Sequence, residues 1–564
     1  MQLVKGNASS DEVTGDAYHL GNLVLDYFNT PGDHIDAGTG KVEMKSSVKS
    51  RSLQLARCLR NAGLKPGDVV AVSGVNHLNA HIPFYAGYLN GLPITGIDPF
   101  YLYEEVKVVL KITKPKLAFC EASSLVDYER AARDLGLDTR IVTFGDGDQS
   151  YANFSRFRVA KFDTHKVYAW LVSTSGTTGL PKVAAIKHSE VIKVVKLGSL
   201  IKGKEMVPVL NPSSVHWVSS YVATLCHISS NQYNVQTSSP QTVEHMIDII
   251  NKYKPTMVCS SPLLFVNIMR HEKYCDLTCF KKIVITGFTM NPEIVKQLKA
   301  RLEGKVGPEG VVWNLMGQTE CVGSILMPAP DGPPGNCGFE LPSVVPVQLV
   351  DLKTGEVITE PNRTGELWTK GPRFTEYYNN PEATAAAFSP DGWYKTGDLL
   401  YRDENGFFFF IERMTSSFRY RNYFVTPLEL EELIQEHPGV LDVCVVGVPH
   451  PEDGKQAVAC VQTHPGFTLT EQDVKDIVAG KYHFNNQASK LSAPKHIHGG
   501  VIFVEDFPRT VAGKIARGKV YDFVLEVRKA VSEYPCSGNT KKLISSFQRL
   551  FDTNNLRIVS TGRH

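Results

Sequence analysis

The chain has 564 residues, and its 60 Lys and Arg nearly balance its 58 Asp and Glu, for a formal net charge of +2. This balance argues against non-specific nucleic-acid binding through bulk positive charge. A hydrophobic content of 42% excludes a disordered chain. At roughly 150 residues per domain, we expect three to four domains, or one large body and a smaller one.

The eleven cysteines are scattered. The only close pair, Cys275 and Cys279, has no second pair nearby, so we expect neither a zinc site nor a disulfide framework. The first residues lack the apolar core of a signal peptide, and the apolar runs are far shorter than the ~20 residues of a membrane span. The last residues, STGRH, are not a peroxisomal tripeptide. We expect a cytoplasmic protein, with the peroxisome as the alternative.

Helices and strands alternate along the first half of the chain. Residues 47–63 have apolar side chains at helical spacing and end at Gly63, and residues 69–74 form a short apolar strand. Further helix–strand units and strands are expected at residues 104–120, 243–262, 281–288 and 310–317. This rhythm predicts an α/β body of doubly wound mixed sheets.

The pattern changes near Val345, where turns become frequent and the strands between them short. We predict an all-β subdomain at about 345–412, which completes an N-terminal domain of residues 1–412. Residues 413–530 return to helices and strands and predict a small α+β domain. Helices are expected at 427–437 and 470–482, and strands at 440–448, 455–463 and 499–507. Residues 531–564 form a C-terminal extension to which we assign no role.

The segment LVSTSGTTGLPK, residues 171–182, runs from an apolar strand into hydroxyl side chains and glycines. Such a loop offers hydroxyl donors, close backbone approach and one positive charge to phosphate oxygens. It differs from the P-loop in the spacing of its lysine. The alternative is a polar linker. The candidate phosphate-binding residues are Thr174, Ser175, Gly176, Thr177, Thr178, Gly179 and Lys182.

This segment resembles the phosphate loop of the adenylate-forming superfamily, which includes acyl-CoA synthetases, firefly luciferases and 4-coumarate-CoA ligases. Residues 499–509 resemble the luciferase and coumarate-ligase branch in particular. Four more segments match motifs of the superfamily in the same order: GQTE at 317–320, YKTGD at 394–398, Arg413 with VTPLELE at 425–431, and PRTVAGKIAR at 508–517.

The resemblance implies that ATP activates a fatty or aryl carboxylic acid to an acyl-adenylate, which then forms a thioester with CoA. Lys514 would bridge the carboxylate and the α-phosphate, and Thr319 would position that phosphate. Glu320 would hold Mg²⁺, a hard cation that prefers oxygen ligands. Asp398 and Arg413 would bind the ribose. The expected partners are therefore ATP, CoA and a small acid, with no nucleic acid, and the protein is expected to be a monomer or weak homo-oligomer.

The resemblance also implies a mobile C-terminal domain that turns about a hinge near residue 413. The hinge and CoA-facing positions are Thr415, Arg419, Arg421 and Asn422. Two of them depart from the family pattern, because Thr415 replaces Lys or Asp and Asn422 replaces a glycine. Asn is the best non-glycine residue for a left-handed backbone, but its side chain would narrow the CoA tunnel.

Further departures lie on the nucleotide and acid sides. Gly287 begins the segment that faces adenine, Met316 replaces an aromatic residue that stacks on adenine, and Val183 replaces a glycine. His216 resembles a family histidine of the acid site. It is a candidate catalytic residue, and the alternative is a structural histidine whose partners lie within the protein.

Two other functions stay open. The first is a luciferase-like monooxygenase, although no residue here requires oxygen chemistry. The second is a degenerate relative that binds nucleotide or acyl groups with weak or no ligase activity, which the departures at Val183, Met316, Thr415 and Asn422 motivate. The sequence does not identify the acid.

Overall fold

A computed structural model describes most of the chain. The described residues are 18–30, 32–101, 103–145, 157–174, 182–199, 207–229, 232–287, 292–302, 312–341, 345–371, 374–414, 418–420, 423–425, 427–450, 453–480, 496–509, 514–533 and 558–561.

The chain divides into two compact units. Unit 1 consists of Met1–Gln348, Trp368–Lys395 and Asp403–Phe409. Unit 2 consists of Leu349–Leu367, Thr396–Arg402 and Phe410–His564. The predicted boundary at residue 412 stays a prediction, because four stretches that alternate between the two units lie between Gln348 and Phe410.

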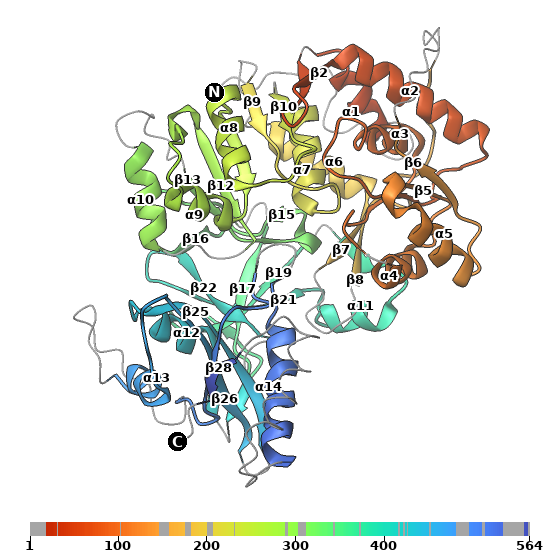
Figure 1. Ribbon diagram of the computed structural model, residues 1–564. Coiled ribbons are helices and arrows are strands. Elements are labelled where there is room, and N and C mark those ends of the chain that lie inside the picture. Colours follow the sequence, from red (N-terminus) through yellow and green to blue (C-terminus); the bar gives the residue numbers. More distant parts are fainter. Residues whose placement is uncertain are drawn as a thin grey trace. The chain divides into compact units, whose positions relative to one another are not determined.

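Unit 1 contains two seven-stranded sheets. In the first, β2 is antiparallel to β1, and the paired neighbours among the other strands run parallel. Figure 1 shows helices α8, α9 and α10 beside strands β12 and β13. The strands of this sheet are, in spatial order, β13 (Val312–Leu315), β12 (Lys282–Thr286), β11 (Met257–Ser260), β9 (Val207–Leu210), β10 (Gln232–Gln236), β1 (Asp33–Asp36) and β2 (Lys41–Met44).

The second sheet is mixed. Its first two pairs, β20 with β8 and β8 with β7, are antiparallel, and the remaining pairs are parallel. Its strands are, in spatial order, β20 (Phe374–Tyr377), β8 (Lys182–Lys187), β7 (Tyr168–Thr174), β4 (Ile94–Gly96), β3 (Val70–Val72), β5 (Leu117–Cys120) and β6 (Arg140–Thr143).

The helices of unit 1 connect these strands, as parallel pairing requires. They are α1 (Leu20–Tyr27), α2 (Lys45–Asn61), α3 (Ile82–Asn90), α4 (Tyr103–Thr113), α5 (Leu125–Asp134), α6 (His188–Ser199), α7 (Val218–Ser229), α8 (Val243–Tyr253), α9 (Pro262–Arg270), α10 (Pro292–Leu302) and α11 (Pro381–Ala387), with short 3₁₀ turns η2 (Ala122–Ser124), η3 (Leu277–Cys279) and η4 (Thr319–Cys321). The predicted α/β class with several mixed sheets and a smaller C-terminal domain is confirmed.

The prediction of an all-β segment at 345–412 is wrong at one point, because α11 lies within it. The Asn380 side chain accepts the backbone N–H of Ala383 at 2.9 Å, and Pro381 occupies the first helical turn. Both are ordinary helix-start signals that the frequent turns around them obscured.

A six-stranded sheet and a small hairpin follow the first two sheets along the chain. The division between the units passes through strands β17, β19, β21 and β22 of the six-stranded sheet. Its strands are, in spatial order, β16 (Asn336–Phe339), β22 (Phe407–Arg413), β21 (Tyr394–Arg402), β19 (Gly365–Thr369), β17 (Val347–Val350) and β18 (Val357–Ile358), and the hairpin is β14 (Gly317–Gln318) with β15 (Gly323–Ser324).

The described residues in the C-terminal part of unit 2 form a second six-stranded sheet with helices α12, α13 and α14. Strand β28 lies in the C-terminal extension and pairs antiparallel with β27, so part of that extension completes the sheet. The elements are β23 (Phe418–Tyr420), β24 (Tyr423–Val425), α12 (Pro427–Gln435), β25 (Val440–His450), β26 (Gly454–Thr463), α13 (Glu471–Val478), β27 (Val501–Val504), α14 (Arg517–Glu533) and β28 (Ile558–Thr561).

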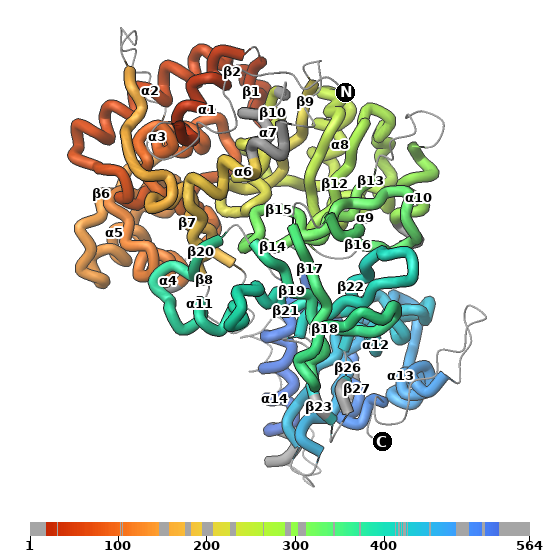
Figure 2. The backbone as a smooth tube through the Cα atoms, turned by 180° about the vertical axis from the view of Figure 1, so that it is seen from behind, coloured from red at the N-terminus to blue at the C-terminus, as the bar shows by residue number. Residues whose placement is uncertain are grey.

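Both faces of this sheet are covered, because successive side chains of a strand point to opposite sides. Val443 and Val445 of β25 pack in one cluster with residues of α12 and α13. Cys444 and Val446 pack in another cluster with residues of α14. Figures 1 and 2 show α14 alongside the sheet.

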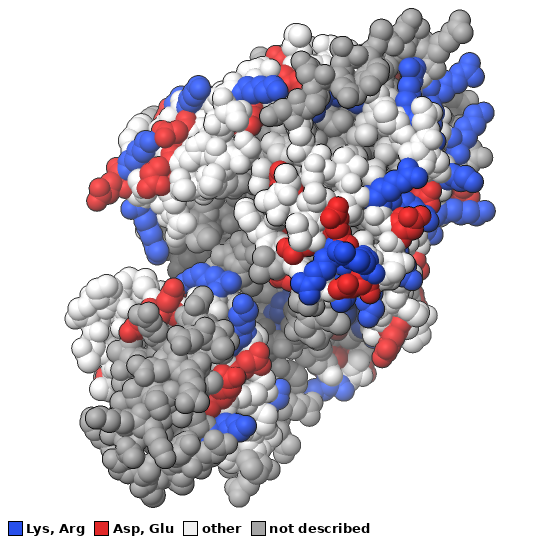
Figure 3. Space-filling model, turned by 45° about the vertical axis from the view of Figure 1, so that its right-hand side comes forward, with Lys and Arg blue, Asp and Glu red and all other residues white. Residues whose placement is uncertain are grey.

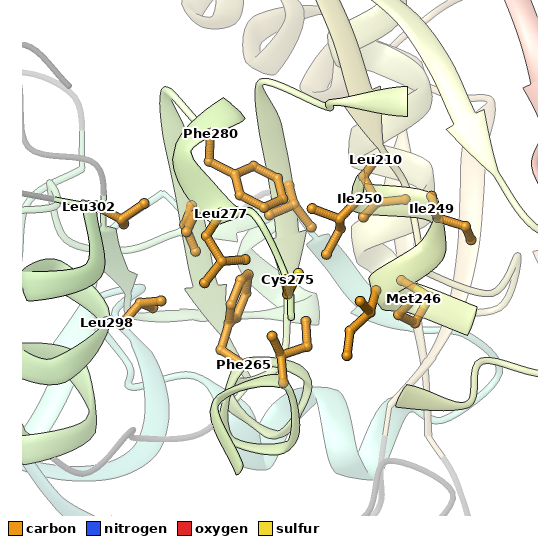
Figure 4. Packing of buried hydrophobic residues seen from close by; sticks show 14 of the residues in the cluster. Leu210, Met246, Ile249, Ile250, Phe265, Cys275, Leu277, Phe280, Leu298 and Leu302 are labelled. Carbon is orange, nitrogen blue, oxygen red and sulfur yellow. The ribbon is translucent and has the colours of Figure 1, made fainter. Parts of the chain in front are cut away.

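The core of the first sheet of unit 1 is built from α8 and its neighbours (Figure 4). Met246, Ile249 and Ile250 of α8 recur at helical spacing and meet Phe265 and Phe280 in one buried cluster. The side chain of Thr242 caps this helix by accepting the backbone N–H of His245.

Charged side chains of both signs are interspersed on the face shown in Figure 3, in keeping with the small net charge. The nine cysteines whose side chains are described are free thiols. In the described part of the chain, no helix is long and apolar enough to cross a membrane.

Candidate active site

The predicted phosphate loop joins two paired strands of unit 1. Thr174 at the end of β7 lies opposite Lys182 at the start of β8 in the antiparallel ladder. The loop therefore begins and ends at one point on the sheet. Ser175, Gly176, Thr177, Thr178 and Gly179 lie outside the described residues. Val183 is a buried strand residue that packs with Leu171, which accounts for an apolar side chain at that position.

Tyr377 contacts both Lys182, through its ring, and Glu320, through its hydroxyl. The Lys182 Nζ is 5.0 Å from the centre of the Tyr377 ring, and the Tyr377 hydroxyl donates to Glu320 Oε1 at 2.7 Å. Glu320 and Tyr377 are both buried. A hydroxyl that donates to a buried carboxylate holds the orientation of that carboxylate. The structure thus brings together two predicted site residues that are distant in sequence.

Tyr377 is a site residue that the sequence analysis missed. It belongs to β20, where it pairs with Ala184 of β8, two residues after Lys182. The segment TEYYNNPE has no signal that links it to Glu320. Only the pairing of β20 with β8 places the ring over the lysine.

Thr319 and Glu320 form the 3₁₀ turn η4, which connects the two strands of the β14–β15 hairpin. The side chain of Gln318 before this turn accepts a hydrogen bond from the Tyr394 hydroxyl at 2.8 Å. Burial, followed by the charge of Glu320, raises the pKa of Tyr394 far above its usual value, so Tyr394 acts as a neutral donor. Thr319 and Glu320 are therefore held in a fixed turn next to a buried tyrosine pair.

Gly287 and Met316 come directly after neighbouring strands. Thr286 of β12 pairs with Leu315 of β13 in parallel register, so the next residue of each strand leaves the same edge of the sheet. Gly287 has a left-handed backbone with φ of +100°, which disfavours any other residue there. The residues 288–291 lie outside the described part of the chain.

His216 has partners within the protein at both ring nitrogens. Its Nε2 lies 3.3 Å from Asp98 Oδ2, and its Nδ1 lies 3.0 Å from the hydroxyl of Ser214. Burial lowers the pKa of His216 to about 4, and the nearby Asp98 opposes this shift without overcoming it. The sequence analysis selected His216 but missed Asp98 and Ser214.

Three predicted residues lie together in unit 2. The Arg413 Nε is 2.7 Å from Asp398 Oδ1. Asp398 is almost fully buried, while nearly half of the Arg413 side chain is exposed. Desolvation and the positive charge of Arg413 lower the pKa of Lys514, and Asp398 opposes them. Asp398, with its acidic side chain, thus interacts with the basic side chains of Arg413 and Lys514. Such a polar cluster is suited to an anionic or hydroxylated ligand.

The predicted hinge residues Thr415, Arg421 and Asn422 lie outside the described residues, and for Arg419 the structure describes the backbone alone. Arg419 lies in β23, where it pairs with Phe424 of β24. The roles of these four positions stay predictions.

The residues present fit a Mg²⁺ ion that takes most of its ligands from phosphates and water and only one carboxylate from the protein. Among the described residues, no cluster of three or more His, Cys, Asp or Glu could hold a metal ion. Mg²⁺ commonly uses one or two carboxylates together with phosphates and water. Glu320, a single oriented carboxylate close to the phosphate-loop lysine, matches that pattern.

A model of the AMP-binding enzyme family matches residues 46–379, and a model of the C-terminal domain of AMP-binding enzymes matches residues 429–514. The chain therefore belongs to the AMP-binding enzymes, the acyl-CoA ligase type of adenylate-forming superfamily. ATP binding follows from this membership.

Relatives and solved structures agree with this assignment. The chain is 27% identical to luciferin 4-monooxygenase of Photinus pyralis over 85% of this chain and 88% of that protein. It is 30% identical to 4-coumarate–CoA ligase-like 6 of Oryza sativa subsp. japonica over 86% of this chain and 82% of that protein. The fold is also similar to that of ATP-bound MatB from Rhodopseudomonas palustris, with a TM-score of 0.75 and 21% identity over 89% of this chain and 98% of MatB.

Proposed function

We propose that this protein uses Mg-ATP to convert a fatty or aryl carboxylic acid to its acyl-adenylate, and then transfers the acyl group to CoA. The observation that carries the proposal is the group of Lys182, Tyr377 and Glu320 at the base of the phosphate-loop hairpin. It supplies a cation for phosphate oxygens and an oriented carboxylate for a metal ion.

In this proposal, Lys182 and the loop residues 174–179 hold the phosphates, and Glu320 holds Mg²⁺, which would neutralise phosphate charge. Thr319 positions the α-phosphate. Catalysis of this kind consists mostly of positioning and charge stabilisation. Gly287 and Met316, at the same sheet edge, supply the adenine side of the site.

The second group of residues acts on the ribose and the reacting atoms. Asp398 accepts hydrogen bonds from ribose hydroxyls, and Arg413 orients that carboxylate. Lys514 bridges the attacking carboxylate and the α-phosphate, where negative charge develops. Arg413 and Asp398 both act on the charge of Lys514, which supports its place beside the ribose-binding residues.

His216 faces the acid in this proposal. Its contacts with Asp98 and Ser214 hold the ring in a fixed position beside the acid. Transfer to CoA depends on the turn of the C-terminal domain and on Thr415, Arg419, Arg421 and Asn422. The cytoplasmic location and the monomeric or weakly oligomeric state remain predictions.

The test is an assay of pyrophosphate release by the purified full-length protein with Mg-ATP and a panel of fatty and aromatic acids, with and without CoA. We expect release that requires an acid and stops when EDTA removes Mg²⁺, and an acyl-CoA product when CoA is present.

Three other outcomes contradict parts of this proposal. AMP formation without a thioester rules out the CoA step and favours a pure adenylating enzyme. Light emission or oxygen uptake with a luciferin favours the luciferase-like alternative that the Photinus relative motivates. No release with any acid favours a degenerate relative that binds ligands without turnover.

A further inference from the structure

His216 contacts both Ser214 and Asp98 in unit 1, the first through a hydrogen bond and the second as a close imidazole–carboxylate pair. The Ser214 hydroxyl is 3.0 Å from His216 Nδ1, and Asp98 Oδ2 is 3.3 Å from His216 Nε2. Asp98 follows β4, whereas Ser214 and His216 lie in the connection between β9 and α7. Two segments distant in the sequence therefore place a hydroxyl, an imidazole and a carboxylate in the order of a Ser–His–Asp triad.

Close backbone contact keeps these two segments together. A side chain on Gly96 would place its Cβ only 2.5 Å from the Val215 carbonyl oxygen and 2.6 Å from the His216 Cα, so glycine is required there. The Gly96 N–H also donates to the hydroxyl of Tyr221, at the first turn of α7, at 2.5 Å. The distance between Asp98 and His216 is thus set by packed backbone.

Asp98 is itself held in place. It is 2% exposed, and its Oδ1 accepts the backbone N–H of Phe100 at 3.0 Å, which leaves Oδ2 directed to His216. The Tyr101 N–H donates to the Asp98 carbonyl oxygen at 3.1 Å. A carboxylate that is oriented in this way orients the imidazole in turn.

The carboxylate selects the tautomer of His216. An Nε2–H that faces the Asp98 carboxylate leaves the Nδ1 lone pair to accept the hydroxyl proton of Ser214. Burial lowers the pKa of His216 to about 4, so the ring is neutral at neutral pH, and the contact with Asp98 opposes this shift.

The surroundings of Ser214 fit an acyl group. Ser214 is partly exposed, unlike Asp98. The next two backbone N–H groups, of Val215 and His216, donate to no acceptor among the described residues. An N–H directly after a nucleophile is a common donor to an oxyanion. The exposed aromatic side chains of Trp217, next to His216, and Phe100, two residues after Asp98, offer apolar contact surface.

We propose that Ser214 is a nucleophile, with His216 as its base and Asp98 as the residue that positions the base, and that this site hydrolyses carboxylic esters with apolar acyl groups without ATP. Ser214 Oγ bonds to the ester carbonyl carbon while its proton passes to His216 Nδ1. The C–O bond to the alcohol then breaks, and the alcohol leaves with that proton. Water attacks the acyl-serine with His216 again as base, which releases the acid and restores the hydroxyl.

The test uses the full-length protein without ATP, a fluorophosphonate probe and p-nitrophenyl butyrate. We expect the probe to label Ser214, as located by peptide mass spectrometry, and the ester to be hydrolysed. Ser214→Ala should remove the labelling and reduce hydrolysis to the rate in buffer. Asp98→Asn should lower kcat by about 100-fold or more with little change in KM, because the amide no longer selects the reactive tautomer.

Ser213→Ala is the matched control, because the hydroxyl of Ser213 bonds to Ser219 and not to the histidine. It should retain labelling and hydrolysis within about twofold. Circular dichroism of each variant establishes that it is folded. Labelling at another residue, or unchanged hydrolysis by folded Ser214→Ala, overturns the proposal. Because the assay contains no ATP, its outcome is independent of whether the protein forms an adenylate.

Discussion

At the residue scale, Lys514 is the side chain on which the proposed adenylation depends most. Lys514→Ala should lower acid-dependent pyrophosphate release by about 100-fold or more, because one charge that stabilises the transition state is lost. ATP binding should change little, since Asp398, Arg413 and Lys182 remain. Release kinetics and calorimetric titration with ATP measure the two effects separately.

The matched control for this variant is Lys519→Ala on the exposed surface of α14. It should leave both measurements unchanged. Equal rates of pyrophosphate release by Lys514→Ala and the unsubstituted protein would contradict the role proposed for this lysine.

Tyr377 allows a second test at this scale, directed at the metal. Tyr377→Phe keeps the ring beside Lys182 but removes the hydrogen bond to Glu320. A hydrogen bond to a charged group contributes about 1.5–3 kcal/mol, so the Mg²⁺ concentration for half-maximal activity should rise by about tenfold or more. Mg²⁺ titration of pyrophosphate release measures this change.

Tyr378→Phe is the control for the tyrosine test, because Tyr378 is the next residue and its ring contacts Tyr168 instead. It should leave the Mg²⁺ requirement unchanged. A similar Mg²⁺ requirement in Tyr377→Phe and Tyr378→Phe would show that the Tyr377 hydroxyl does not position the metal ligand.

At the scale of elements, the β14–β15 hairpin fixes Thr319 and Glu320. A side chain at Gly317 would overlap the backbone carbonyl of Gly323 on the opposite strand. Gly317→Ala should therefore destabilise unit 1 by about 1–3 kcal/mol, because the two strands of the hairpin must move apart to make room for the methyl group. Urea denaturation followed by tryptophan fluorescence measures the loss.

Gly145→Ala provides the comparison for the hairpin. Gly145 has space for a Cβ and no positive φ, so this variant should unfold within about 0.5 kcal/mol of the unsubstituted protein. If Gly317→Ala unfolds at the same urea concentration, the hairpin is less rigid than its contacts indicate.

At the scale of the whole molecule, buried histidines make unit 1 sensitive to acid. Burial lowers the pKa of His34 to about 4, of His81 to about 3 and of His216 to about 4. The pKa values of His19 and His188 are also lowered by burial. Each of these imidazoles is neutral in the folded state at neutral pH. As the pH falls below about 6.5, the unfolded chain binds protons at these histidines while the folded chain does not.

The stability due to these histidines is present above pH 6.5 and is lost as the pH falls from there towards their folded pKa values. Each histidine contributes a slope of up to about 1.4 kcal/mol per pH unit. The urea midpoint should therefore drop steeply between pH 6.5 and 4.5, which denaturation at a series of pH values measures.

His188 is the natural probe of this effect, because both of its ring nitrogens are buried and neither has a hydrogen-bond partner among the described residues. His188→Leu should reduce the dependence of the unfolding free energy on pH by up to about 1.4 kcal/mol per pH unit, which is the contribution of one histidine. Substitution of the exposed His165 by Asn should leave the slope unchanged. A stability independent of pH across this range would contradict the inferred neutral state of the buried histidines.

Much of the fold could be predicted from the sequence, because helices and strands follow from local periodicity. The helix–strand unit expected at 243–262 corresponds to α8 and β11, and the strand expected at 440–448 corresponds to β25. Helix α11 was missed because its cap lies among turn residues, and β28 was missed because its pairing with β27 depends on a distant strand.

For the site, the motifs that resemble those of the family predict which side chains belong to it, including Lys182, Glu320, Asp398, Arg413 and Lys514, and their roles stay predictions. The sequence also determined the family to which the chain belongs. Composition and charge argued against whole classes of protein but did not indicate any residue of the site.

Only the tertiary structure decided the partners of those side chains. Tyr377 reaches Glu320 because β20 pairs with β8 in one register. Asp98 reaches His216 because a glycine lets two backbones touch. Hydrogen bonds act over about 3 Å, so they depend on strand register and packing between segments far apart in the chain, which no local pattern of residues specifies.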